Sequence, residues 1–176
     1  MKDIVLETNG LILRKFNIFD AEDMFYNWAN DEEVTKYMTW NPHVDIEQTK
    51  IILNYWINEY KENNAIRFAI VEKASNQVIG SIDVVDFIND NPEVGYCLSR
   101  KHWNKGYMKE ALSRFISYLF NDLGFSKIVI EADERNIASN KVIEHSGFTF
   151  LYKEYKKECS MFKKYPITVN WYELNK

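Results

Sequence analysis

The chain has 176 residues, of which 46% are apolar, 27% charged and 15% aromatic. These proportions resemble those of globular proteins and exclude an intrinsically disordered chain, a collagen-like fibre and a disulfide scaffold. The formal net charge of −4 at pH 7 argues against a nucleic-acid-binding protein, which presents a basic face. It would suit a cationic partner such as an amine, although a solvated acidic surface explains it equally.

Two cysteines, Cys97 and Cys159, are too few for a disulfide framework and lack the spacing of a metal site. They fit a reducing compartment. The first ten residues contain Lys2, Asp3 and Glu7 and no apolar segment typical of a signal peptide. No run approaches the ~18 apolar residues of a membrane span. We therefore expect one cytoplasmic domain over residues 1–176, with no membrane segment and no bound metal.

The N-terminal third predicts one strand followed by helices. Residues 11–16 read as a strand after the Asn9-Gly10 turn. Asp20 is a suitable N-cap for a helix, and Asp31 for a second short helix that ends near Tyr37. Helical spacing of apolar residues returns from Asp45 to about residue 62.

The remainder predicts strands interrupted by two helices. We expect strands at about 66–72, 78–87, 93–98, 128–132, 148–154 and 167–174, and helices at 107–120 and 139–145. Gly147 indicates the end of the second helix. A helix between the strands near 98 and 128 implies that they are parallel, whereas the earlier hairpins are antiparallel. The order therefore predicts an α+β protein (an α/β mixed sheet).

The loop between strand 93–98 and helix 107–120 could bind an anion. A helix N-terminus presents unpaired N–H groups and the positive end of the helix dipole, and Gly106 permits close approach of a phosphate. Arg100, Lys101 and Lys105 add positive charge. An ordinary strand-to-helix connection with exposed lysines is the alternative, because the glycine patterns of a P-loop or a dinucleotide fold are missing.

Two motifs resemble those of the GNAT superfamily of N-acetyltransferases, and specifically its ribosomal-protein alanine (Rim-type) branch. The run from Glu93 to Leu112, with Glu-Val-Gly-Tyr-Cys-Leu and Trp-Asn-Lys-Gly-Tyr-Met, resembles the acetyl-CoA-binding motif. The run Asn136-Ile-Ala-Ser-Asn to Gly147-Phe148 resembles the second motif, and Leu11-Ile-Leu-Arg the usual start. The resemblance covers about residues 8–174, the expected core of the domain.

The resemblance implies a GNAT fold, with a mostly antiparallel central sheet of about seven strands flanked by helices on both faces, and acetyl-CoA as co-substrate. The strand before the loop carries a bulge in the family, and the strands then splay around the thioester. The residues expected to bind the cofactor fall in three groups: Tyr96, Cys97 and Leu98 for pantetheine; Trp103, Asn104, Lys105, Gly106, Tyr107 and Met108 for pyrophosphate; and Asn136, Ser139 and Asn140 across the gap.

Three positions depart from the family pattern. Asn104 and Met108 occupy positions that are usually small. Asn104 tolerates a left-handed backbone, whereas Met108 could narrow the phosphate site or pack into the core. Ile143 replaces a Tyr that serves as general acid in many GNAT enzymes. Ser139 is the candidate replacement, since its hydroxyl can donate to the leaving thiolate, or it could cap the helix.

Glu93 is the candidate general base for an amine that attacks the acetyl carbonyl directly, although it could be a surface charge. Strand N–H groups near Cys97 and Leu98 could polarise that carbonyl. Cys97 itself reads as an inert apolar residue rather than a nucleophile. The histidines show no ligand spacing and read as surface or packing residues: His43, His102 and His145.

The sequence does not identify the acceptor amine, which could be a small molecule or a protein N-terminal α-amine. Tyr37 and Trp40 could hold an amine by cation–π contact, and the acidic run Asp31, Glu32 and Glu33 could attract a cation. A catalytically weak or inactive CoA-binding sensor, or a pure interaction domain, are the alternative functions. Homodimerisation through the aromatic-rich final strands, as is common in the family, is also possible.

Overall fold

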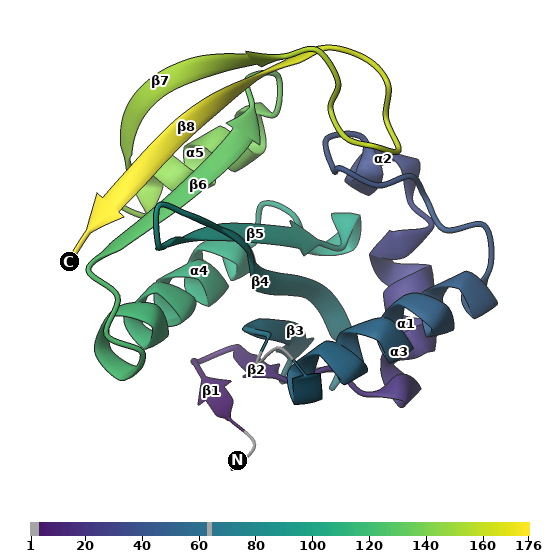
Figure 1. Cartoon of the computed structure of the whole chain (residues 1–176). Coiled ribbons are helices and arrows are strands. Elements are labelled where there is room, and N and C mark those ends of the chain that lie inside the picture. The colour runs from purple at the N-terminus through teal and green to yellow at the C-terminus, as the bar shows by residue number, and fades with distance from the viewer. Residues whose placement is uncertain (1–3, 63–64) are drawn as a thin grey trace.

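The computed structural model describes residues 4–62 and 65–176 (Figure 1). One sheet contains eight strands in the order β1-β2-β3-β4-β5-β6-β8-β7. Their bounds are β1 Val5–Glu7, β2 Leu11–Arg14, β3 Arg67–Glu72, β4 Val78–Ile88, β5 Asn91–Leu98, β6 Lys127–Asp133, β7 Thr149–Lys156 and β8 Ile167–Asn175. All neighbouring pairs are antiparallel except β5 and β6, which are parallel. The predicted mixed, mostly antiparallel sheet is thus confirmed.

The described part of the chain contains five α-helices beside the sheet. They are α1 Ala21–Met24, α2 Glu32–Thr35, α3 Ile46–Glu62, α4 Tyr107–Ser117 and α5 Ile137–His145. Helices α1 and α4 each continue into one π-helical turn, at Phe25–Ala29 and Tyr118–Asp122. Within residues 4–62 and 65–176, no helix combines the length and apolar character needed to span a bilayer.

The central strand β3 is buried on both faces, and helices cover each face. Phe68 and Ile70 of β3 pack in the same cluster as Phe115 of α4, whereas Ala69 and Val71 pack with Leu53 of α3. This alternation follows from the two-residue period of a strand. Figure 1 shows α4 on one side of β2–β5 and α1 and α3 on the other. The apolar side of α4, which includes Met108, Leu112 and Phe115, is therefore part of the core.

The sheet divides where β5 meets β6. Glu93 and Val129 are the one register pair between these strands in the described chain, and β6, β8 and β7 lie apart from β5 beyond it (Figure 1). The expected bulge lies in β4 rather than β5, because Val84 faces Val94 and Asp86 faces Glu93, so that Val85 is the extra residue. A bulge bends its strand and increases its twist.

Two local expectations were met only in part. Asp20 is the N-cap residue of α1, as expected, but its side chain makes no capping hydrogen bond there. The Asp20 carboxylate accepts two hydrogen bonds from Arg14 instead, at 2.8 and 2.7 Å, and Asn17 caps the 3-10 turn Ile18–Asp20. Strand β1 was missed, so the sheet has eight strands instead of about seven. By contrast, Asp31 caps α2, accepting from the Glu33 N–H at 2.9 Å.

Candidate active site

A cavity of about 310 Å³ opens at the division between β5 and β6. Residues of β4, β5, β6 and α5 form one part of its wall, and aromatic residues from the N-terminal segment form another. The lining residues used below are Trp28, Tyr37, Trp40, Trp56, Asp83, Val85, Glu93, Gly95, Tyr96, Cys97, Glu131, Asp133, Asn136, Ser139 and Cys159. Tyr37 and Trp40 thus line the cavity, as their position before Pro42 suggested.

The loop before α4 has the backbone geometry of an anion cradle. Asn104 and Gly106 both adopt left-handed conformations, with φ of 59° and 82°. In the described chain, the N–H groups of Asn104, Lys105 and Gly106 donate no hydrogen bond. They lie next to the N-terminus of α4, where the helix dipole is positive. Met108 is 6% exposed and packs in the main core, so it does not protrude into the loop.

The neighbours of this loop are tied to the sheet. The indole Nε1 of Trp103 donates to the Leu98 carbonyl at 2.8 Å, and the Tyr107 hydroxyl donates to Glu72 of β3 at 2.6 Å. His102 is buried, with its Nε2 3.8 Å from the Glu72 carboxylate. These hydrogen bonds hold both ends of the loop on the sheet. The fold therefore orients the N–H groups of the loop before any ligand binds.

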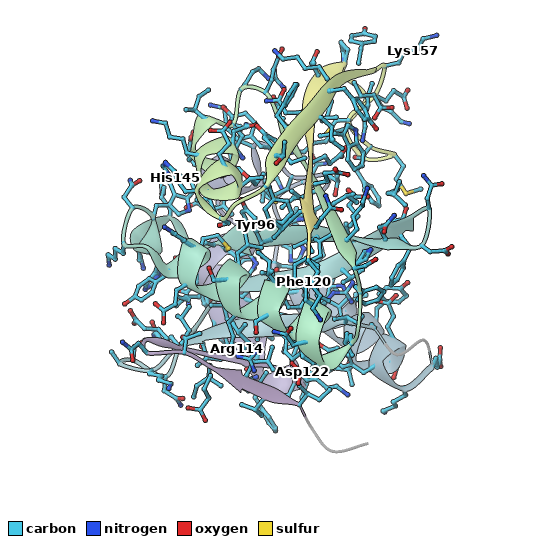
Figure 2. All side chains as sticks on the ribbon, turned by 90° about the vertical axis from the view of Figure 1, so that its left-hand side faces the viewer. Tyr96, Arg114, Phe120, Asp122, His145 and Lys157 are labelled. Atoms are coloured by element: carbon cyan, nitrogen blue, oxygen red, sulfur yellow. The ribbon has the colours of Figure 1, made fainter. Side chains whose placement is uncertain are left out.

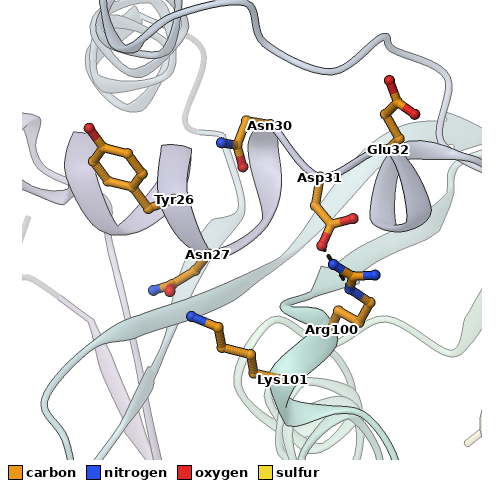
Figure 3. Close-up of a pocket in the computed structure, with 7 residues that line it drawn as sticks. All are labelled: Tyr26, Asn27, Asn30, Asp31, Glu32, Arg100 and Lys101. Carbon is orange, nitrogen blue, oxygen red and sulfur yellow. Dashed lines mark ion pairs between the residues drawn. The ribbon is translucent and has the colours of Figure 1, made fainter.

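Two of the three expected cations lie in a separate polar hollow (Figure 3). Arg100 forms an ion pair with Asp31 at 3.0 Å, and Lys101 points toward Asn27. Asp31 therefore pairs with the 3-10 turn Arg100–His102 instead of facing the cavity. Of the cations expected in the cradle, Lys105 is the one that lies in the loop itself, and it is exposed.

Tyr96 and Ser139 meet across the division between β5 and α5. Their hydroxyl oxygens lie 2.9 Å apart, and Figure 2 shows Tyr96 between α5, which carries His145, and α4, which carries Arg114. Burial raises the pKa of Tyr96 to about 12, so its hydroxyl is neutral at pH 7. If Tyr96 donates to Ser139, the Ser139 proton is available to a third group.

The two asparagines of the second motif, Asn136 and Asn140, have different structural roles. Asn136 caps α5 by accepting from the Ser139 N–H at 3.2 Å, so the suggestion that Ser139 caps this helix was wrong. Asn140 is buried and its amide donates to the carbonyls of Asp133 and Asn136. Its Oδ1 accepts from Asn170 and Tyr172. Asn140 therefore holds α5 on β6 and β8, and its contact with a cofactor stays a prediction.

Glu93 is the carboxylate whose environment best suits a general base. It lines the cavity at the position where β5 pairs with Val129 of β6. Burial and the nearby Glu131 carboxylate raise its pKa from 4.5 to about 7, although Lys156 acts in the opposite direction. Its side chain makes no hydrogen bond to the described part of the chain. A base with a pKa near the working pH is well matched to proton transfer.

A second half-buried carboxylate in the cavity wall, Asp83, was missed by the sequence reading. It accepts a hydrogen bond from Arg67 Nε at 2.9 Å, and the same guanidinium donates to Glu59 at 2.7 Å. The Arg67 guanidinium also lies 4.6 Å from the centre of the Trp56 ring. The signal in the sequence is a charged residue in each of two apolar strands, 66–72 and 78–87, but their pairing depends on register.

The thiol and the imidazoles play no evident part in the site. Burial raises the pKa of Cys97 to about 11, and its sulfur lies 3.3 Å from the Ser81 hydroxyl, which fits the expected inert residue. His43 and His102 are buried and His145 is exposed. No group of three or more metal-ligating side chains occurs among the described residues.

The loop between β7 and β8 reaches over to α2 and the segment after it (Figure 1). We call residues 157–166 the strap. Lys163 Nζ donates to the Thr35 carbonyl at 2.6 Å, and Ser160 Oγ to the Thr39 carbonyl at 2.5 Å. Cys159 of the strap lines the cavity. The strap thus joins the C-terminal half of the molecule to the aromatic wall of the cavity.

Comparisons with known proteins agree with this geometry. The family model for an acetyltransferase (GNAT) domain matches residues 10–149. The uncharacterized N-acetyltransferase p20 of Bacillus licheniformis is 34% identical over 156 residues, which are 86% of this chain and 87% of that protein.

Solved structures share the fold. A putative ribosomal-protein-serine acetyltransferase from Vibrio cholerae superposes with a TM-score of 0.85 at 18% identity, over 99% of this chain and 98% of that one. The microcin C7 self-immunity acetyltransferase MccE, solved with acetyl-CoA and AMP, superposes with a TM-score of 0.81 at 20% identity, over 96% and 94%.

Proposed function

This chain belongs to the GNAT family of N-acetyltransferases, and from that premise we propose that it transfers the acetyl group of acetyl-CoA directly to a primary amine in a ternary complex. The acceptor is a small-molecule amine or a protein N-terminal α-amine. The observation that carries the proposal is the single cavity between β5 and β6. Glu93 lies in its wall together with Tyr96 and Ser139, so a proton acceptor and a hydroxyl donor share one space.

The cofactor fits the residues present. The N–H groups of Asn104, Lys105 and Gly106 are free to bind the CoA phosphates. Beyond the pair Glu93 and Val129, the edge of β5 facing β6 has no ladder partner among the described residues, which leaves Tyr96, Cys97 and Leu98 for pantetheine. Trp103, Tyr107 and Met108 hold the loop in place, and Asn136 and Asn140 support α5 opposite the cofactor.

The reaction needs a neutral amine, since an ammonium has no lone pair. Glu93 accepts the proton directly or through one water. The amine nitrogen then bonds to the acetyl carbon, backbone N–H groups near Cys97 and Leu98 stabilise the oxyanion, and the carbon–sulfur bond breaks. Ser139, oriented by Tyr96, donates its proton to the departing sulfur and regains one from solvent water.

A thermal shift with acetyl-CoA, followed by thiol release in the presence of a panel of amines, tests this proposal. A ligand at about 100 times its dissociation constant adds about 2.7 kcal/mol, so the melting temperature should rise with acetyl-CoA and not with NAD. Thiol release that depends on an amine would support the enzyme. Stabilisation by acetyl-CoA without transfer to any amine would favour the alternative, a CoA-binding sensor.

We also propose that the enzyme belongs with the Rim-type branch and forms a homodimer through β7. The two motifs and the fold shared with the Vibrio cholerae structure support the first point. For the second, β7 is one of the two edge strands of the sheet, and its exposed apolar residues are Phe150, Leu151, Tyr152 and Tyr155, each at least 41% exposed. Light scattering should give twice the chain mass, and a monomer at micromolar concentration would contradict it.

A further inference from the structure

We propose that the acceptor of this enzyme carries a second positive charge, which Asp83 binds while the reacting amine lies at Glu93. This assigns the acceptor to the aliphatic diamines and polyamines and rests on the proposed acetyl transfer. Both carboxylates lie in the wall of the same cavity, and Asp83 has no assigned role in the transfer itself.

Asp83 belongs to a cluster that lacks one positive charge. Arg67 bridges Asp83 and Glu59, at 2.9 and 2.7 Å, so one guanidinium serves two carboxylates. The side chains of all three residues are less than 20% exposed, and water screens them poorly. The face of the guanidinium lies against Trp56. A cation supplied by a ligand would balance the cluster.

One oxygen of the Asp83 carboxylate is not used by any hydrogen bond. Asp83 Oδ2 accepts from Arg67, whereas Asp83 Oδ1 accepts no hydrogen bond in the described chain. Asp83 and Gly95 are register partners on β4 and β5, and the Val85 side chain fills the place that a Gly95 side chain would take, since a Cβ there would come within 2.6 Å of it. Asp83, Val85 and Gly95 all line the cavity, so the carboxylate lies in the cavity wall beside Val85.

The charges elsewhere in the wall leave Asp83 and Glu93 as the sites for a cation. Glu131 pairs with Lys156 at 2.5 Å and Asp133 with Arg135 at 2.6 Å. Among the described residues, the wall contains four carboxylates and no Lys, Arg or His side chain. An acceptor with its own carboxylate, such as a free amino acid, would meet only like charge in this wall.

The chemistry of the transfer requires the second charge to be a separate group. The reacting nitrogen must be neutral when it attacks, so it cannot balance Asp83 at that moment. Gly95 and Glu93 are two residues apart on β5, or roughly 7 Å along the strand. A short alkyl chain can span such a separation, and its methylenes would lie along the aromatic wall that includes Trp28 and Trp56.

Matched acceptors test the inference with the wild-type enzyme. The rate of thiol release from acetyl-CoA should be measured with 1,4-diaminobutane, n-butylamine, 4-aminobutanoate and alanyl-alanine amide. We expect kcat/KM for the diamine to exceed that for n-butylamine by about tenfold or more, since a hydrogen-bonded charge pair gives at least that factor. The aminobutanoate should be the poorest substrate of the four.

The variant Asp83→Asn tests whether Asp83 binds the second positive charge of the acceptor. It should lower the ratio of the diamine rate to the n-butylamine rate by about tenfold. The ratio is internal to each preparation, so a partly unfolded sample does not alter it. Asp90→Asn is the matched control, because Asp90 lies in the β4–β5 turn with φ of 65°, outside the cavity, and its ratio should equal that of the wild type.

Failure of this inference differs from failure of the proposed function. Equal rates for diamine and n-butylamine, or a preference for the peptide amide or the aminobutanoate, would overturn the inference that the acceptor carries a second charge. Acetyl transfer itself would still stand. An unchanged ratio in Asp83→Asn would overturn the role of Asp83. No thiol release with any amine, although acetyl-CoA still stabilises the protein, would instead overturn the proposed function.

Discussion

The hydroxyl oxygens of Tyr96 and Ser139, separated by 43 positions in the sequence, lie 2.9 Å apart. Tyr96 comes from β5 and Ser139 from the first turn of α5, so the contact spans the division of the sheet. Tyr96 has a single hydroxyl proton, which it can donate to Ser139 Oγ or to the Ser139 carbonyl, 3.3 Å away. When Tyr96 donates to Oγ, the serine is free to donate its own proton.

Ser139→Ala should lower kcat because the departing thiolate loses its proton donor. General acid catalysis typically contributes about 10²–10⁴-fold, and we expect a loss of about 100-fold at saturating acetyl-CoA. Tyr96→Phe should cause a smaller loss, because Ser139 keeps its proton and loses only its orientation. Steady-state kinetics measures both. A Ser139→Ala enzyme with wild-type kcat would rule out this role for the serine.

Gly106→Ala should weaken acetyl-CoA binding through the backbone alone. Gly106 has φ of 82°, and an added Cβ would meet no atom within 4 Å, so strain and not collision is the cost. A left-handed residue with a side chain costs about 1–2 kcal/mol. We expect roughly tenfold weaker binding by calorimetry, the equivalent of losing one charge-assisted hydrogen bond to phosphate.

Gly124→Ala is the matched control for that strain. Gly124 has φ of 79° and equally open surroundings, but it lies between α4 and β6, away from the cradle. Both variants should lose about 1–2 kcal/mol of stability, and only Gly106→Ala should bind acetyl-CoA more weakly. Equal affinities in the two variants would show that the loop does not bind the cofactor.

Local features of this chain could be predicted from its sequence. Some features depend on only a few neighbouring residues: the left-handed Asn104, the cap at Asp31 and the helix end at Gly147. Helix α4 could be predicted because its apolar residues recur with the period of a helix. Strand β1 was missed because its three residues, Val5–Glu7, are too few to show the alternation of apolar and polar residues that predicts a strand. Its existence depends on pairing with β2.

The parts that could not be predicted depend on contacts between distant residues. Arg67 and Asp83 pair because the register of β3 and β4 places them opposite each other, and register is set by the whole sheet. Lys163 and Thr35 meet although 128 positions separate them. Asp20 was read as a cap because Asp favours that position, but the ion pair with Arg14 prevailed.

The rate of the enzyme should depend on the ionisation of Glu93. Its pKa of about 7 means that the carboxylate is protonated, and inactive as a base, in acid. We therefore expect kcat/KM to fall below pH 7. Glu93→Gln should lower kcat/KM by about 100-fold and abolish this dependence. A pH profile of both enzymes over pH 5.5–8.5 checks it, and retention of the acid limb in Glu93→Gln would assign the limb to another group.

The same residue should affect stability in the opposite sense. The folded pKa of Glu93 lies above the ordinary value of 4.5, so the native state favours the protonated form and its stability decreases as the pH rises toward 7. At pH 8, Glu93→Gln should therefore raise the free energy of unfolding by about 1–2 kcal/mol, a value reduced for partial exposure. At pH 4 the two proteins should unfold at the same urea concentration.

Lys163→Met should loosen the strap and impair use of the amine without affecting the cofactor. Lys163 is 8% exposed, and its loss removes the charged hydrogen bonds that join the strap to the Thr35 and Lys36 carbonyls, at a cost of about 1.5–3 kcal/mol. Because the strap supports the aromatic wall, KM for the amine should rise while the dissociation constant of acetyl-CoA stays the same.

Lys164→Met is the control, since Lys164 and its partner Glu158 are both more than half exposed and such pairs contribute about 0–1 kcal/mol. An unchanged KM for the amine in Lys163→Met, with the expected loss of stability, would show that the strap only holds the fold.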